Sequence, residues 1–171
     1  LYILEKLKSK FNGKFIITEA VKYEVVDRPI KVPKFEFGAL QIQNLIDSKI
    51  IELPYSLKID KQEIKRETNH LMNLANRCLQ THGNWLRIVS EAECSCLALS
   101  SIIKKYSIES LIVIDERTTR ILTEKPENLK EIMNQKLHSS IEMHTENLKD
   151  FKDFKFIRST ELVYAAFKNG L

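Results

Sequence analysis

The stretch that decides the fold is SEAECSCLALSSIIKKYSIESLIVIDERTTRIL, residues 90–122. Its first half predicts a helix that begins at Ser90, because Ser90 and Glu93 have the spacing of a capping box. Its second half holds SLIVI at 110–114, an uninterrupted apolar run. Such a run is typical of a strand that is covered on both faces. This segment therefore predicts a helix followed by a buried strand.

Asp115 follows this strand with no spacer. In an open parallel sheet, ligands bind at the carboxyl ends of the strands, so the position of Asp115 indicates a site. The same position also suits the N-cap of a helical turn that begins ERTTRIL. Position alone supports both interpretations equally.

Glu91 and Glu93 lie in the first turn of the predicted helix. The capping box explains Glu93 completely. Glu91 falls beside the apolar stripe of the helix, so we expect it to lean toward the edge of the core. A negative charge at a helix N-terminus stabilises the helix by about 0.3–1 kcal/mol, so Glu91 has a structural explanation as well as a catalytic one.

Outward from this stretch, short apolar runs alternate with helical patterns along the whole chain. This alternation predicts an α/β fold with three layers, in which helices cover both faces of a central parallel sheet. We expect one domain over 1–171, with extra helical segments near 60–85 and 126–150.

The main predicted elements are helices over 1–11, 19–26 and 37–48, strands at 14–18 and 155–158, a long helix from Asp60 to Gly83, and a last helix over 159–168. We expect Thr18 to cap the helix over 19–26, and Pro29 and Pro33 to make 27–37 an extended connector. In the segment 126–150, Pro126 begins helical structure and SIEMH at 140–144 is a candidate strand.

Composition restricts the class of protein. The chain has 171 residues, and its 27 basic and 23 acidic side chains leave a net charge of 27 − 23 = +4, which favours an anionic partner weakly. No apolar run approaches the roughly 20 residues needed to cross a bilayer, and no signal peptide is visible, so we expect a soluble cytoplasmic protein with no membrane contact. The three cysteines, Cys78, Cys94 and Cys96, are interpreted as small buried apolar residues rather than as zinc ligands.

Three motifs in this order resemble the PIN-domain family: ITEAVKYEV at 17–25, SEAE at 90–93 and IVIDERTTR at 112–120. The resemblance spans most of the chain, and the order and spacing of the motifs carry it. It implies a metal-dependent nuclease that cuts single-stranded RNA at an acidic cluster on the carboxyl edge of the sheet.

Transferred residue by residue, the resemblance implies that Glu24, Glu91 and Asp115 are catalytic and hold Mg²⁺ or Mn²⁺, with Glu116 as a helper. The family also places an Asp at the end of a first strand that precedes its first helix. This sequence opens inside that helix, so we expect the first strand and its Asp to be missing from it. Without that Asp, the resemblance equally allows an inactive PIN-like scaffold that binds RNA or protein.

Carboxylates suit this chemistry because Mg²⁺ and Mn²⁺ are hard cations that prefer oxygen ligands. Such a cation polarises a phosphoryl oxygen and lowers the pKa of a bound water. RNA phosphates also need cations from the protein. Arg117 and Arg120 follow Asp115 and are placed either for phosphate contact or for ion pairs with Glu116 or Glu124.

A second basic segment, RPIKVPKFEF at 28–37, places Arg28, Lys31 and Lys34 beside two phenylalanines. Cations beside aromatic rings can bind single strands by phosphate contact and base stacking. The alternative is that Phe35 and Phe37 are buried in the core. By analogy with the family, the partners are single-stranded RNA, a second copy of the chain, and an antitoxin if the protein is a toxin-type member.

Overall fold

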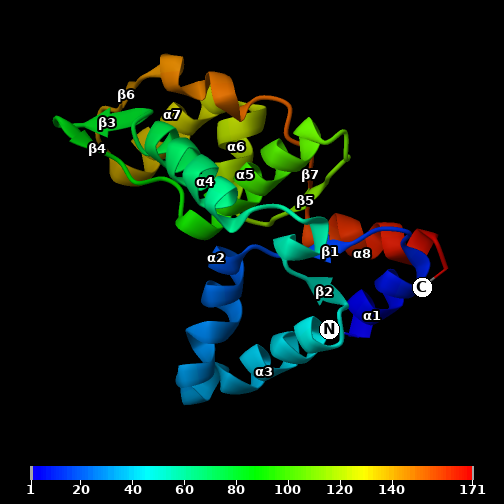
Figure 1. Ribbon diagram of the computed structural model, residues 1–171. Coiled ribbons are helices and arrows are strands. Elements are labelled where there is room, and N and C mark those ends of the chain that lie inside the picture. Colours follow the sequence, from blue (N-terminus) through cyan, green and yellow to red (C-terminus); the bar gives the residue numbers. More distant parts are fainter. Residues whose placement is uncertain (1, 171) are drawn as a thin grey trace. The chain divides into compact units, whose positions relative to one another are not determined.

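The computed structural model describes residues 2–170, which divide into two compact units (Figure 1). Unit 1 comprises residues up to Glu63 together with those from Ser159 onward, and unit 2 comprises Ile64–Arg158. Helices dominate both units, and the strands are short. The prediction of one domain over 1–171 is not tested by this division and stays a prediction.

Unit 1 is built from helices around one short parallel strand pair. Strand β1 pairs with β2 in register Phe15↔Ile51 and Ile16↔Glu52. Its elements, in chain order, are α1 (Tyr2–Lys10), β1 (Phe15–Ile16), α2 (Glu19–Lys22), the π-helix η1 (Tyr23–Asp27), the 3₁₀ turn η2 (Pro29–Lys31), α3 (Pro33–Asp47), β2 (Ile51–Glu52), the 3₁₀ turn η3 (Pro54–Leu57), the first turn of α4 (Lys61–Ala75) and α8 (Ser159–Lys168).

The predicted cap at Thr18 is confirmed: its Oγ1 accepts a hydrogen bond from the N–H of Val21 at 3.2 Å and begins α2. Helix α3 begins earlier than the predicted residue 37, at Pro33. A proline is well suited to the first position of a helix, because its fixed φ is helical and its missing N–H would have no partner there. The connector predicted before residue 37 is therefore partly helical.

Unit 2 holds two further sheets. Strands β4, β3 and β6 form an antiparallel sheet, whereas β5 and β7 form a parallel pair in register Ile112↔Phe156 and Val113↔Ile157. Its elements are most of α4, then β3 (Leu79–Thr81), β4 (Asn84–Trp85), α5 (Glu91–Lys105), β5 (Ile112–Val113), α6 (Arg117–Glu124), α7 (Pro126–Leu137), β6 (Glu142–Met143), the 3₁₀ segment η4 (Thr145–Phe151) and β7 (Phe156–Ile157).

One apolar core runs through unit 2. Its fully buried members come from every helix of the unit, among them Leu71 of α4, Leu97 of α5 and Leu129 of α7. Cys78 and Cys94 belong to the same core, as predicted for small apolar residues. Burial raises the pKa of both thiols to about 12, so neither is a thiolate at neutral pH.

The predicted long helix to Gly83 is wrong beyond Ala75, where α4 ends. The chain then forms the β3–β4 hairpin, with Gln80 opposite Trp85. His82 and Gly83 occupy the turn with φ of 48° and 75°. Positive φ at both central residues is typical of the hairpin turn whose twist matches its strands. Helical structure near 60–85 is therefore limited to α4, whereas α7 does begin at Pro126 and β6 confirms a strand within SIEMH.

The described residues form a mixed α/β fold that is mostly helical, with small separate sheets and no large central parallel sheet among them. The strand predicted at 110–114 is present as β5, but it is not covered on both faces. Ile112 is buried, whereas Val113 is 46% exposed. No helix within residues 2–170 is long and apolar enough to cross a bilayer.

Candidate active site

Asp115 lies just beyond β5, at the carboxyl end of the parallel β5–β7 pair. The ladder between these strands continues to the hydrogen bond from the N–H of Ile114 to the carbonyl of Ile157, at 3.0 Å. Asp115 is the next residue, and its side chain is exposed. The sequence therefore placed Asp115 correctly at a strand end that opens to solvent.

Glu116, rather than Asp115, caps α6. Its two carboxylate oxygens accept hydrogen bonds from the N–H groups of Thr118 and Thr119, at 2.7 and 2.6 Å. Burial raises the pKa of this carboxyl, but the two backbone N–H donors more than offset that effect and hold the pKa below its usual range. The N-cap interpretation of Asp115 is therefore wrong, and the predicted metal helper Glu116 already has a structural role.

Glu91 is the first residue of α5, and it is exposed rather than turned toward the edge of the core. The capping box beside it is confirmed. Ser90 Oγ accepts from the N–H of Glu93 at 3.3 Å, and Glu93 Oε2 accepts from the N–H of Ser90 at 2.7 Å. Since Ser90 and Glu93 complete the cap between them, Glu91 is not part of it.

Glu91 and Asp115 lie at the same end of the α5–β5 unit. The chain reverses after α5, and β5 packs back along the helix, as the 2.7 Å contact between Ser100 Oγ and Ser110 Oγ shows. From Ser100 back to Glu91 the helix rises about 13 Å. From Ser110 forward to Asp115 an extended chain covers about 16 Å. The two paths are nearly equal, so Asp115 returns to about the level of Glu91.

Glu24 lies in unit 1, on the π-helix η1 that continues α2. The wider turn is closed by a hydrogen bond from the N–H of Arg28 to the carbonyl of Tyr23, at 2.9 Å. Short π-helical turns are often found at functional sites, and the carboxylate of Glu24 is exposed. Its position relative to Glu91 and Asp115, both in unit 2, is not determined.

Within residues 2–170, no group of three or more His, Cys, Asp or Glu side chains is arranged to hold a metal ion. Unit 2 holds the exposed residues Glu91 and Asp115, and the carboxylate oxygens of Glu116 accept from the backbone. Two carboxylates fit Mg²⁺, which keeps several waters and commonly binds only one or two protein oxygens directly. They do not make a closed site by themselves.

The two predicted phosphate-binding arginines of α6 differ. Arg117 is exposed, whereas the side chain of Arg120 is only 15% exposed and its Nη2 donates to Glu124 Oε1 at 3.3 Å. Its Nε is buried with no hydrogen-bond partner in the described part of the chain. The ion-pair interpretation is therefore confirmed for Arg120, whereas Arg117, two residues after Asp115, is exposed.

Comparison with known protein families, with curated proteins and with solved structures finds no significant match to this chain. Sequence reasoning missed the capping role of Glu116 and the π-helix that carries Glu24. The signal for the cap was weak, because the first N–H groups of any helix need acceptors and glutamate is not a preferred N-cap residue. The π-helix had no comparable signal, because its width depends on packing.

Proposed function

We propose that the protein is a Mg²⁺- or Mn²⁺-dependent endoribonuclease that cuts single-stranded RNA. Glu91 and Asp115 are its catalytic carboxylates in unit 2. The observation that carries the proposal is the exposure of Glu91 and Asp115 at one end of the α5–β5 unit. That end is also the carboxyl end of a parallel strand pair, where ligands bind in sheets of this kind.

The bound ion would polarise a phosphoryl oxygen and lower the pKa of an attacking water. The protein's own part is to hold that ion and to keep the RNA backbone beside it. The carboxylate oxygens of Glu91 and Asp115 are the hard ligands that such a cation prefers. Arg117, exposed in the first turn of α6, provides a cation for the adjacent phosphate.

The proposal includes a PIN-like, three-layer α/β fold. Its support is the connectivity of each parallel strand pair. Parallel strands need a crossover connection, usually helical. Helices α2 and α3 supply it between β1 and β2, and α6 and α7 supply it between β5 and β7.

The test is cleavage of an unstructured RNA in the presence of Mn²⁺, with and without EDTA. We expect Asp115→Asn and Glu91→Gln each to lower the rate by about 100-fold or more, because metal-site carboxylates and their partners have effects at least this large. Matched controls are Asp153→Asn, another exposed Asp, and Glu127→Gln, another exposed Glu in the first turn of a helix. The controls should cleave at the wild-type rate, and circular dichroism should show that all four variants fold.

Equal activity of Asp115→Asn and Asp153→Asn would overturn the assignment of the site. The alternative function is a PIN-like scaffold that binds RNA or protein without cutting it. It is favoured by the use of Glu116 as a helix cap. RNA binding with no Mn²⁺-dependent cleavage by the wild-type chain would establish the alternative.

A further inference from the structure

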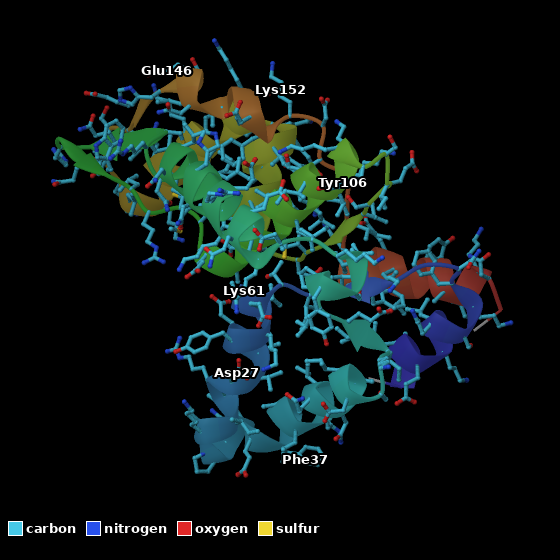
Figure 2. The ribbon with its side chains drawn as sticks, in the orientation of Figure 1. Asp27, Phe37, Lys61, Tyr106, Glu146 and Lys152 are labelled. Carbon is cyan, nitrogen blue, oxygen red and sulfur yellow. The ribbon has the colours of Figure 1, made fainter. Side chains whose placement is uncertain are left out.

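Helix α3 exposes apolar side chains where a helix normally exposes polar ones. Phe37 is 73% exposed, Phe35 54% and Leu40 44%. Figure 2 labels Phe37 on this helix. The possibility that the two phenylalanines are buried in the core is thereby ruled out.

The exposure of Phe37 follows from the direction in which α3 packs. Successive residues of a helix are about 100° apart, so Phe37 and Ala39 point to opposite sides. Ala39 and Leu45 are buried and define the packing face. Phe37 and Leu40 lie opposite that face, where the next turn continues with Gln41 and Asn44, both exposed. The outer face of α3 thus joins an aromatic ring to side-chain amides.

The segment that leads into this face is basic. Arg28, Lys31 and Lys34 are all exposed, and Glu36 is the one acidic residue between Arg28 and Leu40. Lys34 Nζ lies 5.5 Å from the centroid of the Phe35 ring, within cation–π distance. Three exposed cations therefore precede the exposed Phe37 ring closely along the chain.

We propose that Arg28, Lys31, Lys34 and Phe37 form a binding surface for single-stranded RNA, which we call the basic–aromatic surface. Phe35, two residues before Phe37, points to the other side of α3 and is not part of it. A base stacks on the exposed Phe37 ring, and the three cations contact the phosphates. Stacking on aromatic side chains contributes about 1–3 kcal/mol per base whatever the base is. The choice of RNA rests on the proposed function, but binding at this surface requires neither a metal nor cleavage.

Charge complementarity and the composition of the face favour RNA over a lipid surface. A helix that lies in a membrane interface presents a continuous apolar face. The apolar face of α3 ends at Leu40, and Gln41 and Asn44 follow it. Amides buried in acyl chains would lack hydrogen-bond partners, whereas base edges offer donors and acceptors to them.

The experiment measures binding of a fluorescein-labelled oligouridylate of about 12 nucleotides by anisotropy, in EDTA, so that cleavage plays no part. We expect Phe37→Ala to weaken binding by about 5- to 150-fold, the equivalent of losing one stacked base. The matched control is Phe167→Ala, since Phe167 is also 73% exposed and also lies in unit 1. It should bind like the wild type.

A second variant tests the cations separately. Lys31→Gln/Lys34→Gln should lower the slope of log K against log salt by about 0.7 for each phosphate that a lysine no longer neutralises. Lys61→Gln/Lys65→Gln, with two exposed lysines of α4, is the charge-matched control and should keep the wild-type slope. A similar decrease of the slope in both double variants would mean that only net charge matters, and would overturn the proposal.

Three further outcomes would also overturn it: no binding of the oligonucleotide by the wild-type chain, equal effects of Phe37→Ala and Phe167→Ala, or loss of binding to phosphatidylserine vesicles in Phe37→Ala with RNA binding unchanged. Asp153→Asn, at an exposed Asp outside the proposed site, should bind the oligonucleotide normally. Wild-type binding that depends on Phe37, without any cleavage in Mn²⁺, would refute the nuclease and leave this surface established.

Discussion

The two units differ in how much apolar surface they bury. Unit 2 contains one continuous core that includes side chains from α4, α5, α6 and α7. Unit 1 is the shorter, yet it carries eleven of the large apolar side chains that are exposed in the described part of the chain, against six in unit 2. Its buried side chains are not part of the unit 2 core.

The two units therefore contribute differently: the core of unit 2 mainly stabilises the fold, and the exposed apolar side chains of unit 1 suit binding. A continuous core provides most of the free energy of folding, and in unit 2 it holds the α5–β5 unit that positions Glu91 and Asp115. Exposed apolar patches mark interaction surfaces, and unit 1 provides the basic–aromatic surface. Substitutions at equivalent residues of the two units test this difference.

The largest expected difference comes from truncating a buried helical leucine in each unit. Leu129 of α7 is 0% exposed and Leu45 of α3 is 3% exposed. Leu→Ala at buried sites costs roughly 2–5 kcal/mol, and the cost grows with the cavity that remains. We expect Leu129→Ala near the upper end and Leu45→Ala near the lower end, because a continuous core holds a cavity open.

Urea unfolding measures both costs, and amide hydrogen exchange assigns them to a unit. The single tryptophan, Trp85, lies in unit 2, so its fluorescence follows that unit. An equal or larger cost for Leu45→Ala would show that unit 1 is as well packed as unit 2, and the comparison would fail.

A smaller difference in the free energy of unfolding is expected when two carboxylates with lowered pKa values, one in each unit, are substituted. Glu116 of unit 2 accepts from backbone N–H groups, whereas Glu52 of unit 1 accepts from Lys14 Nζ at 2.6 Å. The hydrogen bond from Lys14 lowers the pKa of Glu52 and outweighs the opposite effect of burial. A carboxyl with a lowered pKa in the folded state stabilises the fold above its unfolded pKa of about 4.3, and this contribution is lost as the pH falls through the folded pKa.

We therefore expect Glu116→Ala to cost about 1–2 kcal/mol at neutral pH, as for other N-caps, and much less near pH 3. Glu52→Gln should cost under about 1 kcal/mol, as ion pairs near the surface do. Salt should distinguish the two substitutions. Molar NaCl should reduce the stability lost in Glu52→Gln, because it screens the ion pair, and should leave most of the stability lost in Glu116→Ala. Denaturant titrations at both pH values and both salt levels measure this. Identical salt dependence would contradict the assigned causes.

The sequence predicted the helix starts best, because their signals are local. The capping box of Ser90 with Glu93 and the cap at Thr18 are both present. Pro33 was interpreted as a connector although it starts α3, since proline suits both. Gly83 was interpreted as a helix stop although it forms a hairpin turn, since glycine with positive φ suits both.

The candidate site was predictable only in part. The placement of Asp115 at a strand end and of Glu91 in the first turn of a helix follows from adjacent residues, and both are confirmed. The exposed face of β5 could not be predicted, because an apolar run does not tell which neighbours cover it. The approach of Glu24 to the other two carboxylates stays a prediction, because it depends on the arrangement of the units.

The smallest expected effect concerns the backbone motif that follows α3 in unit 1 and α5 in unit 2. Lys49 ends α3 and Ser107 ends α5 with φ of 59° in both cases. In each, the next N–H bonds back to the carbonyl five residues earlier, Ile50 to Leu45 at 2.9 Å and Ile108 to Ile103 at 3.2 Å, as in a Schellman motif. Left-handed backbone costs an L-residue about 1 kcal/mol and glycine almost nothing.

Lys49→Gly and Ser107→Gly should therefore each stabilise the protein by about 1 kcal/mol, measured by thermal unfolding. Hydrogen exchange should become slower in unit 1 for Lys49→Gly and in unit 2 for Ser107→Gly. A gain from Lys49→Gly that appeared equally in both units would show that they unfold as one, and the distinction between them would then be one of surface alone.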